Sequence, residues 1–363
     1  MRYAVAFLGV VLFAATVASV LRSLVVPAGT ITRISRGVDR MVLAIYHLAI
    51  KPAKSYETKN AVLASQPAAV LFVTLGVWAT SFLFASAMLL WPVTTSFGNA
   101  IREAGASLVT LGFVSTNRPW ATGIDFLTGF TGMIVVALQI AYLPTLYNAY
   151  NRRETEVTLL VGRAGRPAWG PEVLRRSAIG AVPEELPIIY LAWERWAAEV
   201  AETHISYPSL LRFRSPAVAT SWIISFLAVL DAAALNLALT PSSAPMQARL
   251  CVQMGFRAMR QIAGSLKIPF DPDPMPNDPI SVTLDEFNEA VGALQDAGFA
   301  IERSGEEAYR HFAGWRVNYE KLAYRLAYEI DAVPAPWSGS RRWKNVAVNF
   351  PTIINRTPER PNG

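Results

Sequence analysis

The side chains that usually carry catalysis or bind metals are few and scattered along this chain. Its three histidines, His47, His204 and His311, are far apart, and none has the H-E-x-x-H or paired-ligand spacing of a metal site. Cys251 is the only cysteine, so no intrachain disulfide can form, and its helical surroundings favour a core residue over a nucleophile. The sequence therefore predicts neither an enzyme nor a metal or cofactor site.

One carboxylate is notable because of its surroundings. Asp231 is the only charged residue between positions 215 and 247, near the middle of an apolar segment. A carboxylate in such a helix needs a partner, which we expect to be Arg212, Arg214 or His204. The segment is either a buried helix of a soluble domain or a fourth membrane span. A carboxylate at mid-bilayer costs about 2.5–3.5 kcal/mol, which favours the buried helix.

The most informative stretch is the connector at positions 93–125, between two long apolar segments. Thr95 or Ser96 can cap a helix start by accepting hydrogen bonds from free N–H groups. Positions 100–109 are mostly fair helix formers, so a short helix is expected there. This helix points at the tetrad TLGF at positions 110–113.

This order of elements resembles the pore module of the potassium channel family. The shared features are a span, a short helix, a Thr-x-Gly-aromatic tetrad, a proline a few residues later and a second span. The filter of that family reads Thr-Val-Gly-Tyr-Gly-Asp. The aligned run in this chain is Thr110, Leu111, Gly112, Phe113, Val114 and Ser115. The resemblance covers positions 66–150 and implies a homotetramer.

The resemblance also implies roles for particular residues. In a filter, carbonyl oxygens from four copies replace the hydration shell of a monovalent cation, here K⁺ first, and the threonine hydroxyl adds another oxygen ring. The ion-binding residues would then be Thr110, Leu111, Gly112, Phe113 and Val114. A bend of the inner helix for gating is expected at Gly129, Gly132 and Pro144.

Polar residues within the third apolar segment have two readings. A polar side chain inside a membrane tends to face water or the interior of a helix bundle. The residues concerned are Thr128, Thr131 and Gln139. They either line the inner cavity of the pore or form interhelical hydrogen bonds without touching ions.

The departures from the family pattern bear on conduction. Val114 replaces the second filter glycine, and a β-branched residue strongly disfavours the positive φ that glycine accepts. Val114 either stores about 1–3 kcal/mol of strain in each subunit or gives the outer filter another shape. Arg102 and Arg118 oppose cation entry unless Glu103 or Asp125 pairs with them. We expect relaxed K⁺ selectivity or, alternatively, a non-conducting oligomeric scaffold or sensor with a vestigial pore module.

The composition indicates the elements that must position this connector. The 363 residues are 52% hydrophobic and 17% charged, against about 25% charged in a typical soluble domain, which excludes a wholly water-soluble protein. Three segments reach the ~20 residues that cross a bilayer, at positions 3–21, 67–92 and 126–147. The first could be a secretory signal, but its length favours an anchor helix.

Basic residues set the expected orientation. Seven lie between the first and second spans and only two between the second and third, so the long C-terminal part is expected in the cytosol. Positions 41–50 follow a cationic stretch and either lie along the membrane surface, held by anionic lipid, or pack on neighbouring helices. The net charge of +6 fits a membrane partner, and no motif indicates nucleic acid.

The part after position 151 has helical patterns. A helix is expected at 183–204 and a short strand at 157–161, and GRAGRP at 162–167 is no dinucleotide fingerprint. Capping-box patterns at Thr283 and Ser304 predict two helix starts. The second helix, with a 3-4 apolar spacing to Leu326, suits packing within the domain or a coiled-coil seam.

We therefore predict a multi-pass, all-α protein of the cell membrane with a mainly helical cytosolic domain. Its parts are an N-terminal anchor helix (1–30), a basic connector (31–65), a pore module (66–150), a helical cytosolic domain (151–268), a proline-rich linker without helix (269–280), and a C-terminal helical pair with a loosely ordered tail after Trp343 (281–363).

Overall fold

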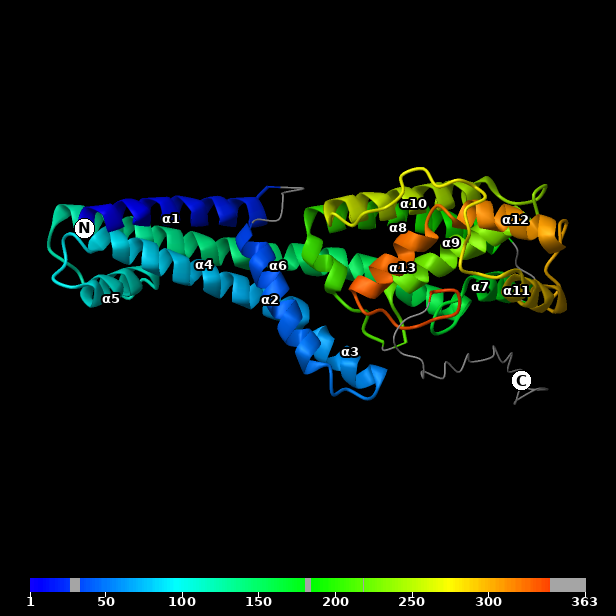
Figure 1. Ribbon diagram of the computed structural model, residues 1–363, viewed down its shortest axis with the longest axis horizontal. Helices are drawn as coiled ribbons and strands as arrows, with labels where there is room; N and C mark the ends of the chain where they lie inside the picture. Colours follow the sequence, from blue (N-terminus) through cyan, green and yellow to red (C-terminus); the bar gives the residue numbers. More distant parts are fainter. Residues whose placement is uncertain (27–32, 180–183, 218, 340–363) are drawn as a thin grey trace. The chain divides into compact units, whose positions relative to one another are not determined.

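The computed structural model describes residues 1–26, 33–179, 184–217 and 219–339, and these are helical with no strand among them (Figure 1). They divide into two compact units. Unit 1 comprises Met1–Pro52 and Ala61–Asn148, and unit 2 comprises Ala53–Asn60 with the chain from Ala149 onward. The expected all-helical class is confirmed.

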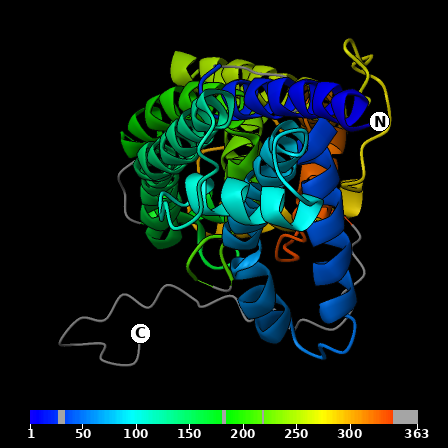
Figure 2. The same cartoon turned by 90° about the vertical axis from the view of Figure 1, so that its left-hand side faces the viewer.

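Unit 1 is built around long apolar helices. The helix α1 (Arg2–Leu24) lies along α4 (Gln66–Leu90), and the first part of α6 (Pro119–Ala164) packs beside them (Figure 1). The short α5 (Phe97–Leu108) lies at one end of this bundle, and α2 (Arg33–Ala49) lies at the other. The helix α3 (Tyr56–Ala64) leads into α4. Figure 2 views unit 1 from the end that carries α5.

Close helix contacts hold unit 1 together. Trp78 and Phe82 of α4 are buried, and Trp78 Nε1 donates a hydrogen bond to Ser19 Oγ of α1 at 3.2 Å. A Cβ atom on Gly9 would lie only 2.9 Å from the Ala85 carbonyl oxygen, so glycine permits the approach of α1 to α4. Small residues at such crossings are typical of helices that pack in membranes.

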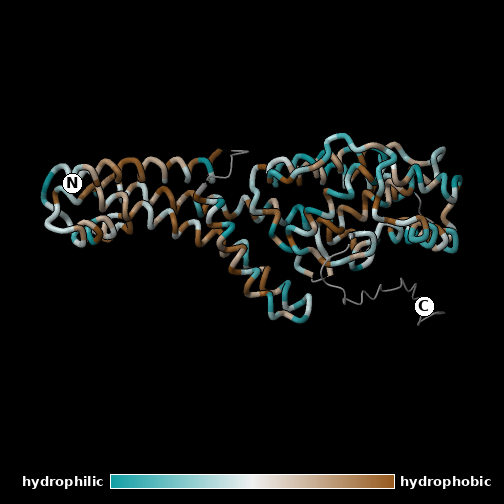
Figure 3. The backbone as a smooth tube through the Cα atoms, in the orientation of Figure 1, coloured by the Kyte–Doolittle hydropathy of each residue, from teal (hydrophilic) through white to brown (hydrophobic). Residues whose placement is uncertain are grey.

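Four helical stretches are long and apolar enough to cross a membrane: α1, α3–α4, α6 and α9 (Trp222–Leu239). In the first three, 22%, 17% and 11% of the most apolar window is buried within the protein. Brown, apolar backbone accordingly follows α1, α4 and the first part of α6 in Figure 3. Large side chains such as Phe126, 75% exposed, cover the outside of unit 1.

Unit 2 surrounds the helix α9. Its other helices are α7 (Gly170–Ile179), α8 (Glu185–Ser206), η1 (Pro208–Arg212), α10 (Met246–Ser265), α11 (Leu284–Asp296), α12 (Gly305–Arg316) and α13 (Glu320–Glu329). The most apolar window of α9 is 94% buried, as expected for a buried helix. Gly170 and Gly255 let α7 and α10 approach α9, because a Cβ on either would lie about 2.5 Å or less from an α9 side chain.

Several local predictions have clear outcomes in unit 2. The expected strand at 157–161 is wrong, because these residues continue α6 and bury Val157 and Leu160 in the core. The helix expected at 183–204 is found as α8. The capping box at Thr283 is confirmed, since its Oγ1 accepts from Glu286 N at 3.2 Å and its N–H donates to Glu286 Oε2 at 2.8 Å. The positions 269–280 contain no helix, as expected.

The long helix expected from Ser304 to Leu326 is two helices. Ser304 precedes α12, but its side chain makes no capping hydrogen bond. The chain leaves α12 after Arg316, and α13 begins at Glu320. Phe312 and Leu326 both lie in the core of unit 2, so the apolar spacing serves packing within the unit. The expected tail after Trp343 lies outside the described residues.

Candidate functional site

The short helix in the connector starts at a side-chain cap. Ser96 has extended backbone, and its Oγ accepts a hydrogen bond from Asn99 N at 3.2 Å, while Asn99 Nδ2 donates to Thr95 Oγ1 at 2.6 Å. Such bonds satisfy N–H groups that have no partner inside the helix. The buried alanines Ala100 and Ala104 then let α5 pack closely. The sequence prediction of this helix and its cap is confirmed.

The filter-like residues, Thr110 to Val114, follow the C-terminal end of α5. Thr110 has φ +56°, and the N–H of Leu111 donates to the Ala106 carbonyl oxygen at 2.8 Å. A left-handed residue followed by this bond back into the last turn is a common way to end a helix. Gly112 has φ +62° and also donates its N–H to Ala106 O, at 3.2 Å. The chain therefore leaves the helix within positions 109–112.

A buried carboxylate fixes the far side of this loop. Glu103 of α5 is 1% exposed, and its two oxygens accept hydrogen bonds from Thr116 N at 2.5 Å and from Thr116 Oγ1 at 2.6 Å. A buried carboxylate is tolerated when donors satisfy it, so this double contact accounts for its burial. Glu103 thus holds Thr116, the residue directly after positions 110–115, against α5.

The sequence reasoning missed this tie. Glu103 and Asp125 were considered only as partners for Arg102 and Arg118. Within the described residues neither carboxylate forms an ion pair with either arginine: Asp125 Oδ1 accepts from Ser107 Oγ at 2.7 Å, and Glu103 holds Thr116. The spacing of Glu103 from Ala100 places it on the buried face of α5, and that is the signal that could have indicated its role.

The filter-like residues themselves are open on the single chain. Leu111 and Phe113 are 66% and 65% exposed, and a Cβ on Gly112 would meet no atom within 4 Å. The stretch borders a hollow of about 750 Å³. Its lining comes from the loop and the first turns of α6, and includes Thr110, Gly112, Val114, Thr122, Asp125 and Phe130.

Val114 does not have a positive φ. Within the described residues, positive φ outside glycine occurs at Thr110, Lys267, Asp331 and Trp337. Of the two alternatives for Val114, strain at a glycine position is therefore not observed. The outer half of this loop has its own shape, with Val114 half-buried.

The three polar residues predicted for the pore lining lie in different surroundings. Thr128 is 1% exposed, and its Oγ1 lies 2.9 Å from Ser86 Oγ of α4, which is the interhelical contact of the alternative reading. Gln139 is 8% exposed. Thr131 is half-buried, with its Oγ1 donating to Leu127 O at 2.7 Å. Thr128 and Gln139 are thus buried within the single chain, whereas Thr131 is partly exposed, and the role of all three in lining a pore stays a prediction.

The residues predicted for a gating bend lie in an unbroken helix. Pro144 lies inside α6, where it removes one backbone hydrogen bond. Gly129 and Gly132 instead face the end of α5: a Cβ would lie 3.1 Å from Ser107 O and 2.3 Å from Leu108 O, respectively. These two glycines therefore let the carbonyl end of α5 reach the α6 backbone.

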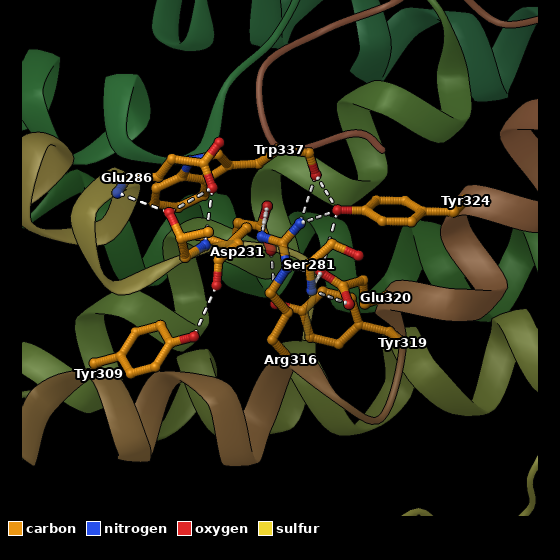
Figure 4. Close-up of polar contacts among 11 residues, drawn as sticks. Asp231, Ser281, Glu286, Tyr309, Arg316, Tyr319, Glu320, Tyr324 and Trp337 are labelled. Carbon is orange, nitrogen blue, oxygen red and sulfur yellow. Dashed lines mark hydrogen bonds and ion pairs between the residues drawn. The ribbon is translucent and has the colours of Figure 1, made fainter. Parts of the chain in front are cut away.

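A second polar cluster lies in the core of unit 2 (Figure 4). Asp231 Oδ2 accepts from Arg316 Nη1 at 2.6 Å, and Asp231 Oδ1 accepts from Tyr319 Oη at 2.8 Å. Arg316 Nε also donates to Glu320 Oε1 at 2.9 Å, and both Glu320 oxygens accept from Ser281 N. Arg316 is 0% exposed. The expected partners Arg212, Arg214 and His204 are therefore wrong for Asp231.

Two of those expected partners serve other contacts. His204 Nε2 lies 3.1 Å from Arg153 Nη1, and Arg214 Nη1 donates to the Ile330 carbonyl oxygen at 2.7 Å.

Burial raises the pKa of the Cys251 thiol, which keeps it protonated and unreactive. In the described part of the chain no three His, Cys, Asp or Glu residues are grouped as metal ligands. The contacts of Asp231, His204 and Arg214 join different segments of unit 2.

Comparison with protein-family models, with curated proteins and with solved structures finds no match to this chain.

Proposed function

We propose that four copies of this chain form a membrane channel for monovalent cations, with K⁺ as the first candidate and Thr110 to Val114 as its filter. The observation that carries this proposal is the loop between α4 and α6. A short helix ends there on an exposed, non-helical TLGFV stretch, which Glu103 fixes through Thr116. Non-helical backbone at membrane depth is stable only when protein buries it or when it lines water.

The exposure of the loop supports a shared site. A filter formed by four copies has to present its carbonyl oxygens on the outside of each single chain. Leu111, Gly112 and Phe113 are all exposed, and so are large apolar side chains on the neighbouring turns of α6, such as Phe126 and Phe130. Contact with lipid or with other copies would cover this apolar surface. The carbonyl end of α5 would favour a cation beside it.

The proposal includes an orientation and a route for regulation. The helices α1, α4 and the first part of α6 cross the cell membrane, and unit 2 lies in the cytosol, because the basic loop between α1 and α4 resists translocation. The continuous α6 supports coupling between unit 2 and the pore, since residues 119–148 belong to unit 1 and the rest of the helix to unit 2.

Val114 favours a filter with relaxed selectivity. A valine without positive φ cannot reproduce the carbonyl arrangement that a glycine gives at this position. Fewer carbonyl rings then surround the ion, so Na⁺ is rejected less strongly. We expect Val114→Gly to shift the bi-ionic reversal potential toward that of K⁺. A wild-type current that is already strictly K⁺-selective would contradict this part of the proposal.

The decisive experiment is thallium or potassium flux into liposomes that carry the purified protein. Gly112→Ala should abolish most of the flux, because alanine disfavours φ +62° and the change is repeated in every copy. Gly123→Ala is the matched control, since Gly123 lies in α6 and a Cβ there meets no atom within 4 Å. Equal flux from both variants, or particles without fourfold symmetry in detergent, would refute the channel.

A non-conducting scaffold or sensor is the second candidate. The contacts of Glu103 and Asp125 favour it, because these carboxylates hold Thr116 and Ser107 and leave the positive charge of Arg102 and Arg118 uncompensated at the outer mouth. In that case fourfold particles form but pass no ions. Fourfold symmetry without flux, unchanged by Arg102→Gln together with Arg118→Gln, would establish this candidate over the channel.

A further inference from the structure

The helix α2 has two groups of apolar residues, one buried within unit 1 and one exposed on the single chain. Val38 and Val42 are 5% and 3% exposed and face the bundle of unit 1. Met41, Ile45 and Leu48 are 48%, 57% and 64% exposed. Residues four and three positions apart share one side of a helix, so these three form a continuous apolar stripe. We call it the α2 stripe.

Two hydrogen bonds place α2 at one end of the long helices. Ser35 Oγ lies 3.0 Å from Ser23 Oγ, in the last turn of α1, and Tyr46 Oη lies 2.9 Å from Ser65 Oγ, directly before α4. The C-terminus of α1 and the N-terminus of α4 lie at the same end of their bundle, opposite α5 (Figure 1). If α1 and α4 cross a bilayer, α2 lies where they leave it.

The charge around α2 is positive. Arg36 and Arg40 lie on the polar side of α2 that also carries His47, and Lys51 lies two residues after the end of the helix. Arg22 lies in the last turn of α1, and Asp39 is the one acidic residue of α2. An exposed apolar stripe beside cationic side chains at the end of membrane helices fits a bilayer surface with anionic headgroups.

We propose that α2 is an interfacial helix that binds anionic phospholipid. Met41, Ile45 and Leu48 enter the boundary between headgroups and acyl chains, and Arg22, Arg36, Arg40 and Lys51 contact the lipid phosphates. In this arrangement the segment both packs on neighbouring helices, through Val38 and Val42, and lies along the membrane surface, through the α2 stripe. The proposal requires only that α1 and α4 insert into a membrane, and it does not depend on conduction.

The position of the α2 stripe can be measured by fluorescence quenching. Full-length protein in nanodiscs carries bimane at Met41→Cys, Ile45→Cys or Leu48→Cys, with His47→Cys as the control on the polar side of the same helix. The native Cys251 is buried, and unlabelled background is checked in the parent protein. Lipids brominated on the acyl chains should quench the three stripe positions strongly and His47→Cys weakly.

Two outcomes of this measurement overturn the proposal. Equal quenching at all four positions shows that α2 has no lipid-facing side. Shielding of the stripe from both brominated lipid and aqueous iodide shows that protein covers it, as a second copy of the chain would. Either result is independent of the flux assay, so it is distinguishable from failure of the channel.

The contribution of the basic residues is tested by measuring how strongly the protein prefers anionic over zwitterionic phospholipid. The triple variant Arg36→Gln, Arg40→Gln and Lys51→Gln should lower the preference for fluorescent phosphatidylglycerol over phosphatidylcholine, by about fivefold for each charge removed at low salt. The control removes three exposed charges from unit 2, through Arg257→Gln, Arg310→Gln and Lys321→Gln. An unchanged preference in the α2 variant, or an equal loss in the control, overturns the assignment to α2.

Discussion

Two helical stretches of equal mean hydropathy have opposite surroundings in this molecule. In the α3–α4 stretch 17% of the most apolar window is buried within the protein, whereas in α9 the share is 94%. Apolar composition therefore indicates that a helix must be buried. It does not distinguish burial by other helices of the same chain from burial by lipid or by another chain. Unit 2 covers α9 with its own helices, whereas much of the apolar surface of α4 and α6 is exposed on the single chain.

The polar residues of the two units differ in the same way. Asp231 and Asn236 lie within α9 and are satisfied by partners from other helices, Arg316 and Tyr190. In unit 1 the side-chain bonds between helices are single contacts, such as Trp78 to Ser19 and Thr128 to Ser86, and the hydroxyls of Ser81 and Thr131 donate to carbonyl oxygens one turn back in their own helices. A buried network that joins several helices restricts the packing of unit 2 more than the single bonds between helices restrict that of unit 1.

The largest expected effect tests whether the buried network holds unit 2. Arg316→Met leaves the carboxylates of Asp231 and Glu320 buried without their cation, so the free energy of unfolding should fall by about 3–5 kcal/mol. Denaturation of the full chain by urea, followed by tryptophan fluorescence, measures the change. Arg325→Met removes the exposed pair with Glu329, whose side chains are 54% and 29% exposed, and should cost less than about 1 kcal/mol. Equal losses would show that the buried network contributes no more to the stability of unit 2 than an exposed ion pair does.

The next effect concerns the close approach of α7 to α9. Gly170→Ala places a Cβ 2.5 Å from the Asp231 Cβ and 3.0 Å from Ala228 O, so α7 must shift, at about 1–3 kcal/mol. Gly162→Ala in α6 meets no atom within 4 Å and should stabilise by about 0.5–1 kcal/mol, because alanine favours a helix interior. Opposite signs in urea denaturation are the expected result. A stabilising Gly170→Ala would show that the packing around α9 is loose.

Some elements could be predicted from the sequence because their signals are local. The long apolar helices, the cap at Ser96 and the capping box at Thr283 each depend on residues a few positions apart. The division of 304–326 into two helices was missed because its apolar spacing continues across Tyr319, although the helix does not. The segment VTLLV at 157–161 was misread because burial of Val157 and Leu160 in the core outweighs its β propensity.

The polar partners could not be predicted for a different reason. Asp231 and Arg316 are 85 residues apart, and nearer cations competed for the assignment. Only the fold brings α9 and α12 together. Glu103 and Thr116 are 13 residues apart, but the turn between them had been read as a filter alone. Distant contacts depend on topology, which short patterns in a sequence do not contain.

Acid should weaken unit 2 through His204. Burial lowers the pKa of His204 well below its usual value, and the charge of Arg153 lowers it further. The ring is therefore neutral in the fold, accepting at Nε2 from Arg153 and donating at Nδ1 to Val200 O, 2.9 Å away, as assigned from these partners. Other neighbours are the Trp222 ring, Thr203 and Glu154, which pairs with Arg153.

The sign follows from proton linkage. Below about pH 6.5 the unfolded chain binds a proton at His204 that the folded chain does not, so stability is full above that pH and falls as the pH decreases toward the lowered pKa. His204→Gln keeps an acceptor for Arg153 and should reduce this slope between pH 6.5 and 5. Urea midpoints across that range measure it. An identical slope in His204→Gln would assign the acid sensitivity to other groups.

The smallest expected effect tests whether unit 1 depends on local bonds. Ser96→Ala removes the acceptor for Asn99 N at the start of α5 and should cost about 1 kcal/mol of helix stability. Because Ala100 and Ala104 pack the rest of α5 into a core with α4 and α6, faster amide exchange should be confined to the first turn. Thr95→Ala loses only a bond from the Asn99 side chain and serves as the control. Faster exchange throughout α4 and α6 would mean that unit 1 unfolds as one cooperative body, as unit 2 is expected to do.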